Sequence, residues 1–566
     1  MNEGPPKRDD LPNPSVSDPD PGKAKEEAPE PRDLKSSLHS QSTSACSSAT
    51  PAIKQQLRNF HYRSGVRRRQ PARPSAGTSA QPKVPSLLSE RPAYDPRKGA
   101  PPKHIALSAA AKWERFNPRL ADLANASERR AGEEAAGCRP SDEEVAQLDR
   151  RLNARFRGTA AAGRPIDIVI GIDFGTSSTK IVARAPYEAG QPTFAVPALP
   201  FAQADQHPYL WASRLWLTAS GMFSLRPTPD AAFLGGIKAR LMAVQHGEAR
   251  VPYASNVRLT PEATATAFLA LQIRQAVGWL VTEKDSLLRR GAPRWSFNFG
   301  FPAASLDEAR LRECYHRCIA AAAEIALGQA EVTLDTVPAA LATIRPIGRQ
   351  GSNRSEVTLH PEIAAAVAGF TGSMRHEDGL YALVDVGGST VDCCTFALIR
   401  RNGESRCPIF AAGVKPLGVE PWRLCEGDRH AEDEFSEVLD LLQTSVIWHT
   451  KQSRDPKSDR WRTGLPVFYV GGGKMSEAHR RSAERLHHWL SVYVPNGIQD
   501  VAPLLEEEGF EAPGCRVDQL HRLIVAMGLS RPAHDIPRVE LPAQIDDIQP
   551  PPRREVETAY IGKDQV

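Results

Sequence analysis

The sequence lacks three features that would define its class from composition alone. Its nine cysteines follow no regular spacing along 566 residues, which argues against a disulfide framework and for a reduced, cytoplasmic setting. No run is long and apolar enough to span a bilayer, and the first residues hold no apolar signal core, so we expect no membrane partner. The net charge of +4 is small for this length, so composition does not point to nucleic acid as a partner of the whole chain.

Proline, by contrast, is abundant. The 48 prolines and a mean hydropathy of −0.40 predict that a large part of the chain does not fold. Residues 1–104 are rich in Pro, Ser and Arg, and their few apolar side chains cannot offset the entropy of an ordered chain, so we expect a disordered tail. Within it, the basic segment 58–73 has aromatic neighbours. This segment is either a solvated linker or a binding site for an acidic partner, with nucleic acid as one example.

From residue 105 onward the sequence predicts folded elements. A capping box at Ser141–Glu144 predicts the start of a helix in a helical lead-in over 105–164. Beyond it, apolar strands alternate with helical segments, which is typical of an α/β protein. Thr260 and Pro261 predict a helix start, and Trp295–Pro302 alternates as a strand that ends at proline. The stretch from Pro338 to Leu359 contains Gly, Ser and Asn and is predicted as a surface loop.

The stretch Gly171–Lys180 is the first candidate binding turn. It follows the buried strand predicted over Ile166–Ile172, and Asp173 stands where that strand ends. Gly175 allows backbone amides to approach an anion, and Lys180 offers a cation. The residues between them offer hydroxyl groups: Thr176, Ser177, Ser178 and Thr179. The alternative is an ordinary β-hairpin with a small-residue turn.

The same pattern returns twice. The strand Tyr381–Val384 leads to Asp385, which is followed by a second turn of Gly387, Gly388, Ser389 and Thr390. Two such turns facing each other would hold a phosphate chain, with a hydrated Mg²⁺ shared between Asp173 and Asp385. The strand Leu465–Val470 then ends in Gly471, Gly472 and Gly473, where backbone can approach a base or ribose closely.

Lys238 stands among apolar residues and glycines, in Ala231–Arg240. Its ammonium group either reaches a terminal phosphate or leaves the start of a helix toward solvent. Lys180 is a second candidate for the same phosphate, and the sequence leaves the choice between the two lysines open.

Together these motifs resemble the actin-like ATPase superfamily, which includes actin, sugar kinases and the heat-shock 70 kDa chaperones. Asp173–Lys180 is similar to the first phosphate motif, Asp385–Asp392 to the second, and Gly471–Gly473 to the adenosine motif. The nucleotide-binding domain of the chaperones fits best. Phe299–Pro302 resembles the end of one of its strands, and Ala364–Ala366 resembles the alanine run after its catalytic glutamate.

The resemblance implies a two-lobed α/β fold built from ribonuclease-H-like subdomains, with ATP or ADP and Mg²⁺ between the lobes. It implies catalytic roles for Lys238, Glu362, Asp385 and Thr390, and a metal role for Asp173 and Asp385. The residues implied to bind the nucleotide are Gly175, Thr176, Ser177, Ser178, Lys180, Gly387, Gly388, Ser389, Gly471, Gly472 and Gly473.

The sequence departs from the chaperone pattern at three points. Glu362 follows Pro361, whereas the chaperones have glutamate before proline, so its role requires a shift of one residue. Ser389 stands where a third glycine is usual. The interval from Gly418 to Val470 is short for a second chaperone lobe, and the Pro-rich end holds no peptide-binding domain.

The predicted organisation has five parts. They are a disordered tail over 1–104, a helical lead-in over 105–164, a first lobe over 165–380, a second lobe over 381–530 and a Pro-rich tail over 531–566. The predicted function is a chaperone-like ATPase that acts on a protein partner through slow hydrolysis. The alternatives are a sugar-type kinase, and a nucleotide-dependent scaffold or filament protein with little hydrolysis.

Overall fold

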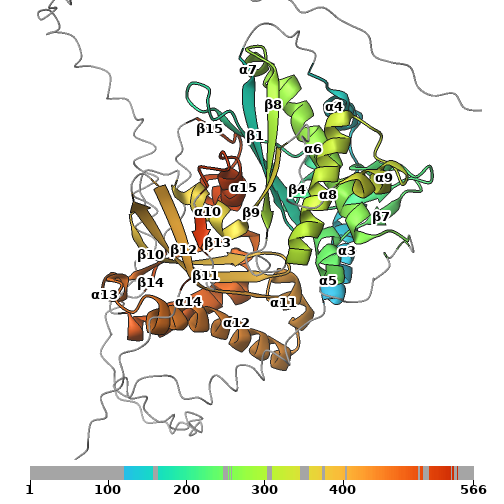
Figure 1. The fold of residues 1–566 in the computed structure, drawn as a ribbon. Coiled ribbons are helices and arrows are strands. Elements are labelled where there is room, and N and C mark those ends of the chain that lie inside the picture. Colours follow the sequence, from blue (N-terminus) through green and yellow to red (C-terminus); the bar gives the residue numbers. More distant parts are fainter. Residues whose placement is uncertain are drawn as a thin grey trace, which may run out of the picture. The chain divides into compact units, whose positions relative to one another are not determined.

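The computed structural model describes most of the chain from residue 120 onward. The described residues are 120–156, 164–245, 253, 255, 258–301, 309–344, 356–371, 377–401, 404–494, 498–500, 509–536, 538–540 and 545. The predicted tail 1–104, including the basic segment 58–73, lies outside them, as does most of 531–566. The described chain is a mixed α/β protein with several sheets, as the alternation of strands and helices predicts (Figure 1).

The first large sheet is built around β1 (Ile166–Phe174). Its strand order is β15-β3-β2-β1-β8-β9, with β4 also paired to β2. β1, β2 and β3 are antiparallel neighbours, whereas β8 and β9 run parallel to β1. The other strands are β2 (Ser178–Arg184), β3 (Thr193–Ala195), β4 (Trp211–Ala212), β8 (Pro293–Phe301), β9 (Glu356–Pro361) and β15 (Phe510–Glu511).

The second large sheet repeats this arrangement around β10 (Gly379–Val386). Its order is β16-β12-β11-β10-β13-β14, again with three antiparallel strands followed by two parallel ones. The other strands are β11 (Val391–Arg401), β12 (Glu404–Lys415), β13 (Leu465–Val470), β14 (Ile498–Asp500) and β16 (Arg538–Glu540). In chain order, β10, β11, β12, β13 and β14 thus correspond to β1, β2, β3, β8 and β9, so the described chain contains one sheet topology twice.

Equivalent helices connect the equivalent strands. In the first half, α6 (Pro261–Glu283) precedes β8, α8 (Ala309–Gly328) follows it, and α10 (Glu362–Thr371) follows β9. In the second half, α12 (Arg429–His449) precedes β13, and α14 (Glu477–Tyr493) and α15 (Ile524–Leu529) follow later. Each sheet therefore receives helices at the same points of its connectivity.

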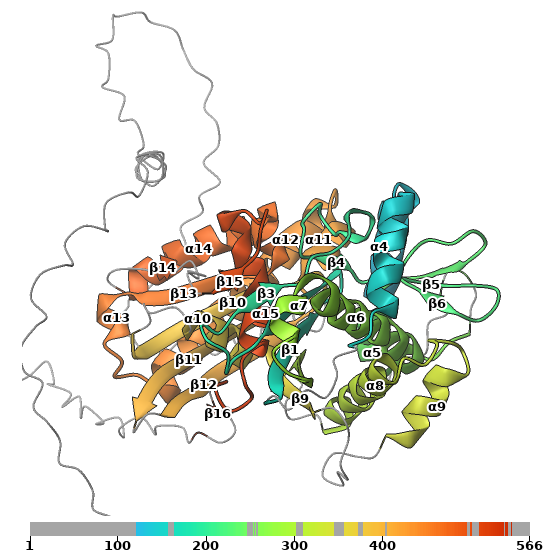
Figure 2. The ribbon, with the colours of Figure 1, turned by 90° about the horizontal axis from the view of Figure 1, so that it is seen from above.

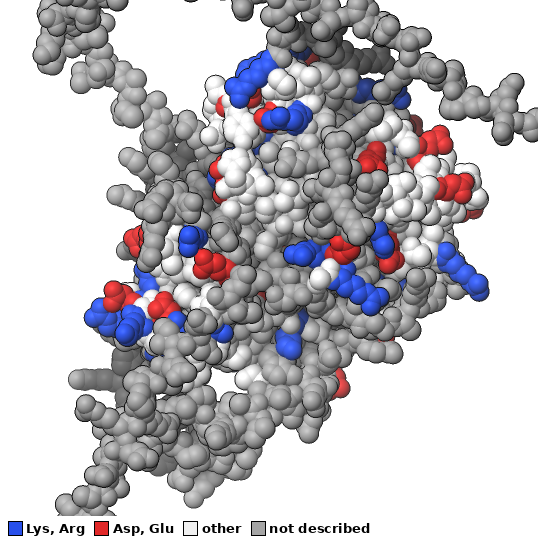
Figure 3. Space-filling view, in the orientation of Figure 1, with Lys and Arg blue, Asp and Glu red and all other residues white. Residues whose placement is uncertain are grey.

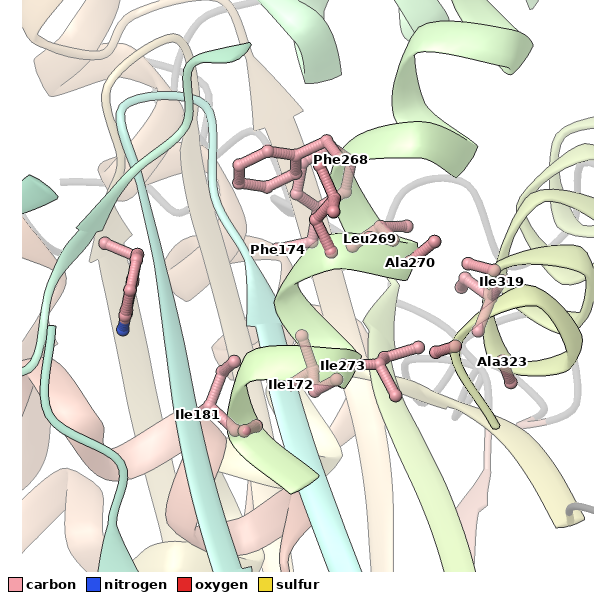
Figure 4. Packing of buried hydrophobic residues seen from close by; sticks show 14 of the residues in the cluster. Ile172, Phe174, Ile181, Phe268, Leu269, Ala270, Ile273, Ile319 and Ala323 are labelled. Atoms are coloured by element: carbon pink, nitrogen blue, oxygen red, sulfur yellow. The ribbon is translucent and has the colours of Figure 1, made fainter. Parts of the chain in front are cut away.

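Alternating apolar residues bury one face of each sheet under a pair of helices. On β1, Ile168, Ile170, Ile172 and Phe174 share one core with α6 and α8. Figure 4 shows part of this core, where the rings of Phe174 and Phe268 lie 5.8 Å apart. On β10, Leu380, Ala382 and Val384 pack under α12 and α14 in the same way.

The other face of the second sheet packs on α10 and α15, which lie between the two sheets (Figures 1 and 2). These two helices contact each other, and α15 also contacts β1, β2 and β8. A Cβ atom added at Gly171 of β1 would lie 2.4 Å from the carbonyl oxygen of Ala526. Glycine at 171 is therefore needed for the close approach of α15 to the first sheet.

Two helices precede β1 in the part of the chain that the structure describes. α3 (Leu120–Ala136) packs on α5 (Ile237–Gln245), and α4 (Asp142–Asn153) packs on α6. The predicted capping box of α4 is confirmed, because the Ser141 and Glu144 side chains each accept a hydrogen bond from the other residue's backbone N–H. The predicted start of α6 is confirmed as well, since the Thr260 hydroxyl accepts a hydrogen bond from the Ala263 N–H.

The remaining elements are short. A three-stranded sheet contains β5 (Leu215–Leu217), β6 (Phe223–Ser224) and β7 (Ala232–Leu234). The short helices are α7 (Asp285–Leu288), α9 (Thr336–Thr343), α11 (Val419–Cys425) and α13 (Arg460–Thr463). The described residues also form four short 3₁₀ or π turns: η2 (Pro200–Ala202), η4 (Thr450–Arg454), η5 (Gly472–Met475) and η6 (Val517–Leu523).

The predicted loop from Pro338 to Leu359 is wrong at both ends. Pro338 belongs to α9, near the start of the helix, where a missing N–H breaks no helical hydrogen bond. The segment Glu356–Pro361 forms the strand β9, because its backbone pairs with β8. Helix α10 begins directly after this strand, at Glu362.

Charges of both signs are interspersed on the face shown in Figure 3, among the residues drawn in colour. No helix in the described part of the chain combines the length and apolar character needed to cross a bilayer.

Candidate functional site

One pocket collects almost all of the candidate residues. It contains about 1130 Å³ of empty space, part of which is open to solvent. Its walls come from the ends of β1, β10 and β13, and from α5 and the first residue of α10. The predicted residues that line it are Asp173, Gly175, Thr176, Ser177, Ser178, Lys180, Lys238, Glu362, Asp385, Gly387, Gly388, Thr390, Gly471, Gly472 and Gly473.

The first turn joins β1 to β2. Asp173 and Lys180 are paired across these strands, and their charged groups lie 2.9 Å apart. A Cβ atom at Gly175 would lie 2.3 Å from the carbonyl oxygen of Ser178, so the turn is too tight for a side chain there. The Ser213 hydroxyl donates to the Gly175 carbonyl at 2.9 Å and fixes the turn from outside.

The second turn joins β10 to β11 and faces the first. A Cβ atom at Gly388 would lie 2.5 Å from the Ser177 hydroxyl oxygen, so the two turns touch. The start of α11 holds this turn, because the N–H groups of Val419 and Glu420 donate to the carbonyls of Gly387 and Gly388 at 3.2 and 2.7 Å. The two turns therefore meet in one pocket although they belong to different sheets.

The third turn follows β13. Gly471 has a φ of 83°, and a Cβ atom there would lie 2.2 Å from a carboxylate oxygen of Asp385. Glycine is required at 471 by both its backbone conformation and its neighbour. The guanidinium of Arg522 lies over Gly472, where an added Cβ atom would come within 2.7 Å of it.

The two candidate lysines have different partners. Lys180 pairs with Asp173, whereas Lys238 donates to Glu362 at 3.0 Å. Burial, the largest single effect, lowers the pKa of Lys238. The negative charges of Glu362, Tyr315 and Asp173 and the hydrogen bond to Glu362 together outweigh it, so the pKa is raised and the lysine is charged. Glu362 is the first residue of α10, and this position brings its carboxylate into the pocket.

Carboxylates crowd the bottom of the pocket. Burial, followed by the charges of Glu362 and Asp173, raises the pKa of Asp385 to about 7. Burial and the charges of Glu362 and Asp385 also raise the pKa of Asp392. The Oδ1 atom of Asp392 is buried and accepts no hydrogen bond.

Such a cluster of carboxylates could hold a hard cation. Mg²⁺ takes one or two protein carboxylates and completes its shell with waters and phosphate oxygens. The residues that could hold it are Asp173 and Asp385, and an unsatisfied oxygen of Asp392 lies in the same pocket. Among the described residues, no group of three or more His, Cys, Asp or Glu side chains is placed to hold a metal directly.

Two residues of the predicted turns, Thr179 and Ser389, do not line the pocket. Thr179 is buried, and its hydroxyl is hydrogen-bonded to that of Ser213. Ser389 lies behind the second turn. Its side chain is buried, and its carbonyl accepts a hydrogen bond from the Gly418 N–H at 3.1 Å. The residue thus faces α11 and holds the turn from behind. A small side chain suffices for that position.

The sequence analysis missed several residues of the pocket wall. Most of these residues belong to none of the three predicted turns. They are Arg130, Asp205, Val419, Arg423, Ser476, His521, Arg522, Ile524 and Val525. Asp392 also lines the pocket, and the sequence indicated it only as the last residue of the second motif. Arg130 and Arg522 come from segments far outside the three turns, and only the folded chain brings them to the pocket.

Comparison of the chain with protein-family models and with curated proteins finds no match.

Proposed function

We propose that this protein is a two-lobed actin-like ATPase, similar to the nucleotide-binding domain of the heat-shock 70 kDa chaperones. It binds ATP with Mg²⁺ in the pocket and uses slow hydrolysis to switch the conformation that a protein partner reads. One observation carries the proposal. Two strand–aspartate–glycine turns, from two sheets of the same topology, face each other in a single pocket.

Each part of the pocket suits a different part of the nucleotide. In this proposal the hydroxyls and amides of the first and second turns bind phosphate oxygens, and Thr176, Ser177 and Thr390, which line the pocket, supply three of the hydroxyls. Gly471–Gly473 also line the pocket, and we assign the adenosine to them. Mg²⁺, held by Asp173 and Asp385, would neutralise phosphate charge.

Hydrolysis needs a positioned water and a cation near the terminal phosphate. Glu362 offers a carboxylate that accepts a hydrogen bond from the water, and Lys238 holds that carboxylate in place at 3.0 Å. Lys180 adds a second cation at the first turn. Neither lysine is free of a carboxylate partner, so phosphate must compete for them, which is consistent with slow turnover.

The conformational switch would act at α10 and α15. These helices pack tightly between the sheets, so closing the lobes on ATP requires them to slide against each other. Loss of the terminal phosphate removes contacts to both turns at once and favours the open arrangement.

Titration calorimetry with Mg²⁺–ATP, together with measurement of phosphate release, tests this proposal. We expect binding and slow release in the wild type. Asp385→Asn should weaken Mg²⁺-dependent ATP binding by at least about 100-fold, because the change removes the carboxylate charge and charge-assisted contacts are stronger than neutral ones. Asp433→Asn, an exposed position on α12, is the matched control and should bind like the wild type.

Three outcomes would replace the proposal. Absence of any nucleotide binding would exclude a nucleotide function. Binding without phosphate release would identify a nucleotide-dependent scaffold, and release that requires a sugar or other polyol would identify a kinase.

A further inference from the structure

Helix α3 precedes both sheets, yet it supplies a residue to the pocket wall. Arg130 of α3 lines the pocket, and its guanidinium lies 2.5 Å from the carboxylate of Glu420 on α11 and 3.6 Å from that of Asp205. The Glu420 side chain is only 5% exposed, and Arg130 is the nearer of its two guanidinium neighbours, since that of Arg423 lies 3.6 Å away. The two members of this ion pair at the pocket wall are therefore 290 positions apart in the chain.

The first connection runs from Arg130 to the second glycine turn. Glu420 accepts a hydrogen bond from Arg130 through its side chain, and its backbone N–H donates to the Gly388 carbonyl at 2.7 Å. One residue thus links the guanidinium of α3 to the turn predicted to bind phosphate. A change in the position of Arg130 must alter the environment of that turn.

The second connection runs from Arg130 to the third glycine turn. Asp205 lies between Arg130 and Arg522, and Arg522 donates to it at 2.8 Å. Arg522 in turn packs over Gly472. Asp205 has a φ of 53°, an uncommon value for a residue with a side chain, so its backbone is held in a specific conformation at this point.

α3 is fixed firmly enough to transmit such a change. Glu128 forms a buried ion pair with Arg240 of α5, and Asn125 accepts a hydrogen bond from the same guanidinium at 3.0 Å. A Cβ atom at Gly236 would lie 2.3 Å from the Ala124 carbonyl oxygen. α5 also carries Lys238, one of the two lysines proposed to contact the terminal phosphate. The contacts between α3 and α5 therefore link α3 to this part of the pocket as well.

We propose that Arg130 is a positioning residue through which α3 and the nucleotide pocket stabilise each other. This inference rests on the proposed nucleotide function for its ligand and on the ion pairs above for its geometry. Arg130 makes the shorter of the two ion pairs of Glu420 beside the second turn, so its loss would leave this buried carboxylate with only the more distant Arg423, next to the phosphates. By linkage, bound nucleotide must strengthen the attachment of α3 as much as α3 strengthens nucleotide binding.

The test uses the full chain and five variants. Arg130→Ala should weaken Mg²⁺–ATP binding about tenfold in calorimetry, whereas Arg129→Ala, an exposed arginine on the same helix, should change it less than about twofold. In a Glu420→Gln background, the same Arg130→Ala change should weaken Mg²⁺–ATP binding by less than about threefold, because the negative charge that Arg130 pairs with is already absent. Arg130→Lys should recover part of the affinity. Equal effects of Arg130→Ala in both backgrounds, or tighter binding in Arg130→Ala, would overturn the inference.

Hydrogen exchange separates this inference from the proposed function. In the ligand-free chain, Arg130→Ala should speed exchange in 386–390 and in 120–136, and Arg129→Ala should not. This exchange experiment needs no nucleotide. A wild type that binds no nucleotide would therefore refute the proposed function, and the exchange rates of Arg130→Ala and Arg129→Ala would still decide whether Arg130 positions the second turn. Unchanged exchange at 386–390 in Arg130→Ala would refute the positioning role. In the wild type, Mg²⁺–ADP should slow exchange in 120–136, and exchange there that ignores bound nucleotide would refute the linkage.

Discussion

Single residues define what the pocket can do, and its two lysines differ in a way that the sequence does not reveal. Both were candidates for the same phosphate, and both line the pocket. Lys238 is more deeply buried, with 9% of its side chain exposed against 15% for Lys180. Lys238 also pairs with the glutamate that would orient water, whereas Lys180 pairs with an aspartate assigned to the metal.

These contacts predict different defects for the two lysine variants. Lys238→Ala should reduce the rate of phosphate release about 100-fold, because it removes a cation from the terminal phosphate and frees Glu362 to move. Lys180→Ala should mainly raise the Kd for Mg²⁺–ATP, by about tenfold, with a smaller change in the rate. Single-turnover phosphate release at saturating nucleotide, compared with calorimetry, distinguishes the two. The opposite pattern would assign the terminal phosphate to Lys180.

At this scale the sequence predicts the residues whose neighbours in the chain define a motif. Asp173, Gly175, Asp385 and Gly471 each end a strand or start a turn, so local chemistry identifies them. Arg130 gives no such signal, because its partner Glu420 is 290 residues away. Long-range ion pairs depend on the fold, and a single sequence does not contain that information.

Among the elements, α10 and α15 depend most on the absence of side chains. A Cβ atom at Gly528 would lie 1.7 Å from the carbonyl oxygen of Ala365, and one at Gly369 would lie 2.3 Å from that of Ile524. The two helices therefore approach each other with backbone against backbone. Side-chain interdigitation does not set their separation at these two points.

Gly528→Ala should therefore lower the free energy of unfolding by about 3 kcal/mol, since the helices must separate to admit the methyl group. Gly328→Ala is the matched control at the end of α8, where an added Cβ atom meets nothing within 4 Å. That variant should change stability by less than about 1 kcal/mol. Urea unfolding measures both, and equal stabilities would show that α10 and α15 adjust without cost.

The elements themselves were predictable where strong local signals begin or end them. The helix starts at Ser141 and Thr260 follow from their caps, and the strands before the three turns follow from apolar runs. α9 and β9 were missed because proline and a Gly-Ser-Asn stretch resemble a loop. β9 gains its strand conformation from pairing with β8, which is a tertiary contact.

Across the whole molecule, the repeated topology of the two sheets was visible in the sequence only as a repeated turn. Two strand–aspartate–glycine segments predicted a duplication, but the corresponding order of ten strands needs the backbone pairing. The same pairing explains why the turns face each other, since each sits at the end of the central strand of its own sheet.

Three histidines from distant elements predict how stability depends on pH, of which His207 and His521 are buried and His360 is half-buried. Burial lowers the pKa of His207, His360 and His521 to about 4, below the ordinary value of about 6.5. Between these values the unfolded chain binds protons that the folded chain does not. The free energy of unfolding that depends on these neutral histidines is therefore fully present above pH 6.5. It is lost as the pH falls toward 4, by up to about 1.4 kcal/mol per pH unit for each group.

Urea unfolding at a series of pH values measures this slope. His360→Gln should reduce the slope of unfolding free energy against pH near pH 5 by the equivalent of about one bound proton. His430→Gln, at an exposed position, should leave the slope unchanged. A slope that is the same in His360→Gln and the wild type would show that His360 is already protonated in the folded chain.

The neighbouring cysteines of β11 report on the two faces of the second sheet separately. Cys393 belongs to the core under α12 and α14, and Cys394 to the core against α10 and α15, as their alternation along a strand predicts. Burial raises the pKa of Cys393 to about 12 and that of Cys394 also upward, so neither thiol reacts while its face is covered. A thiol reagent added during unfolding therefore labels each of these adjacent cysteines only after the helices that cover its face have left the sheet. The order in which they are labelled tells which layer of helices leaves the sheet first.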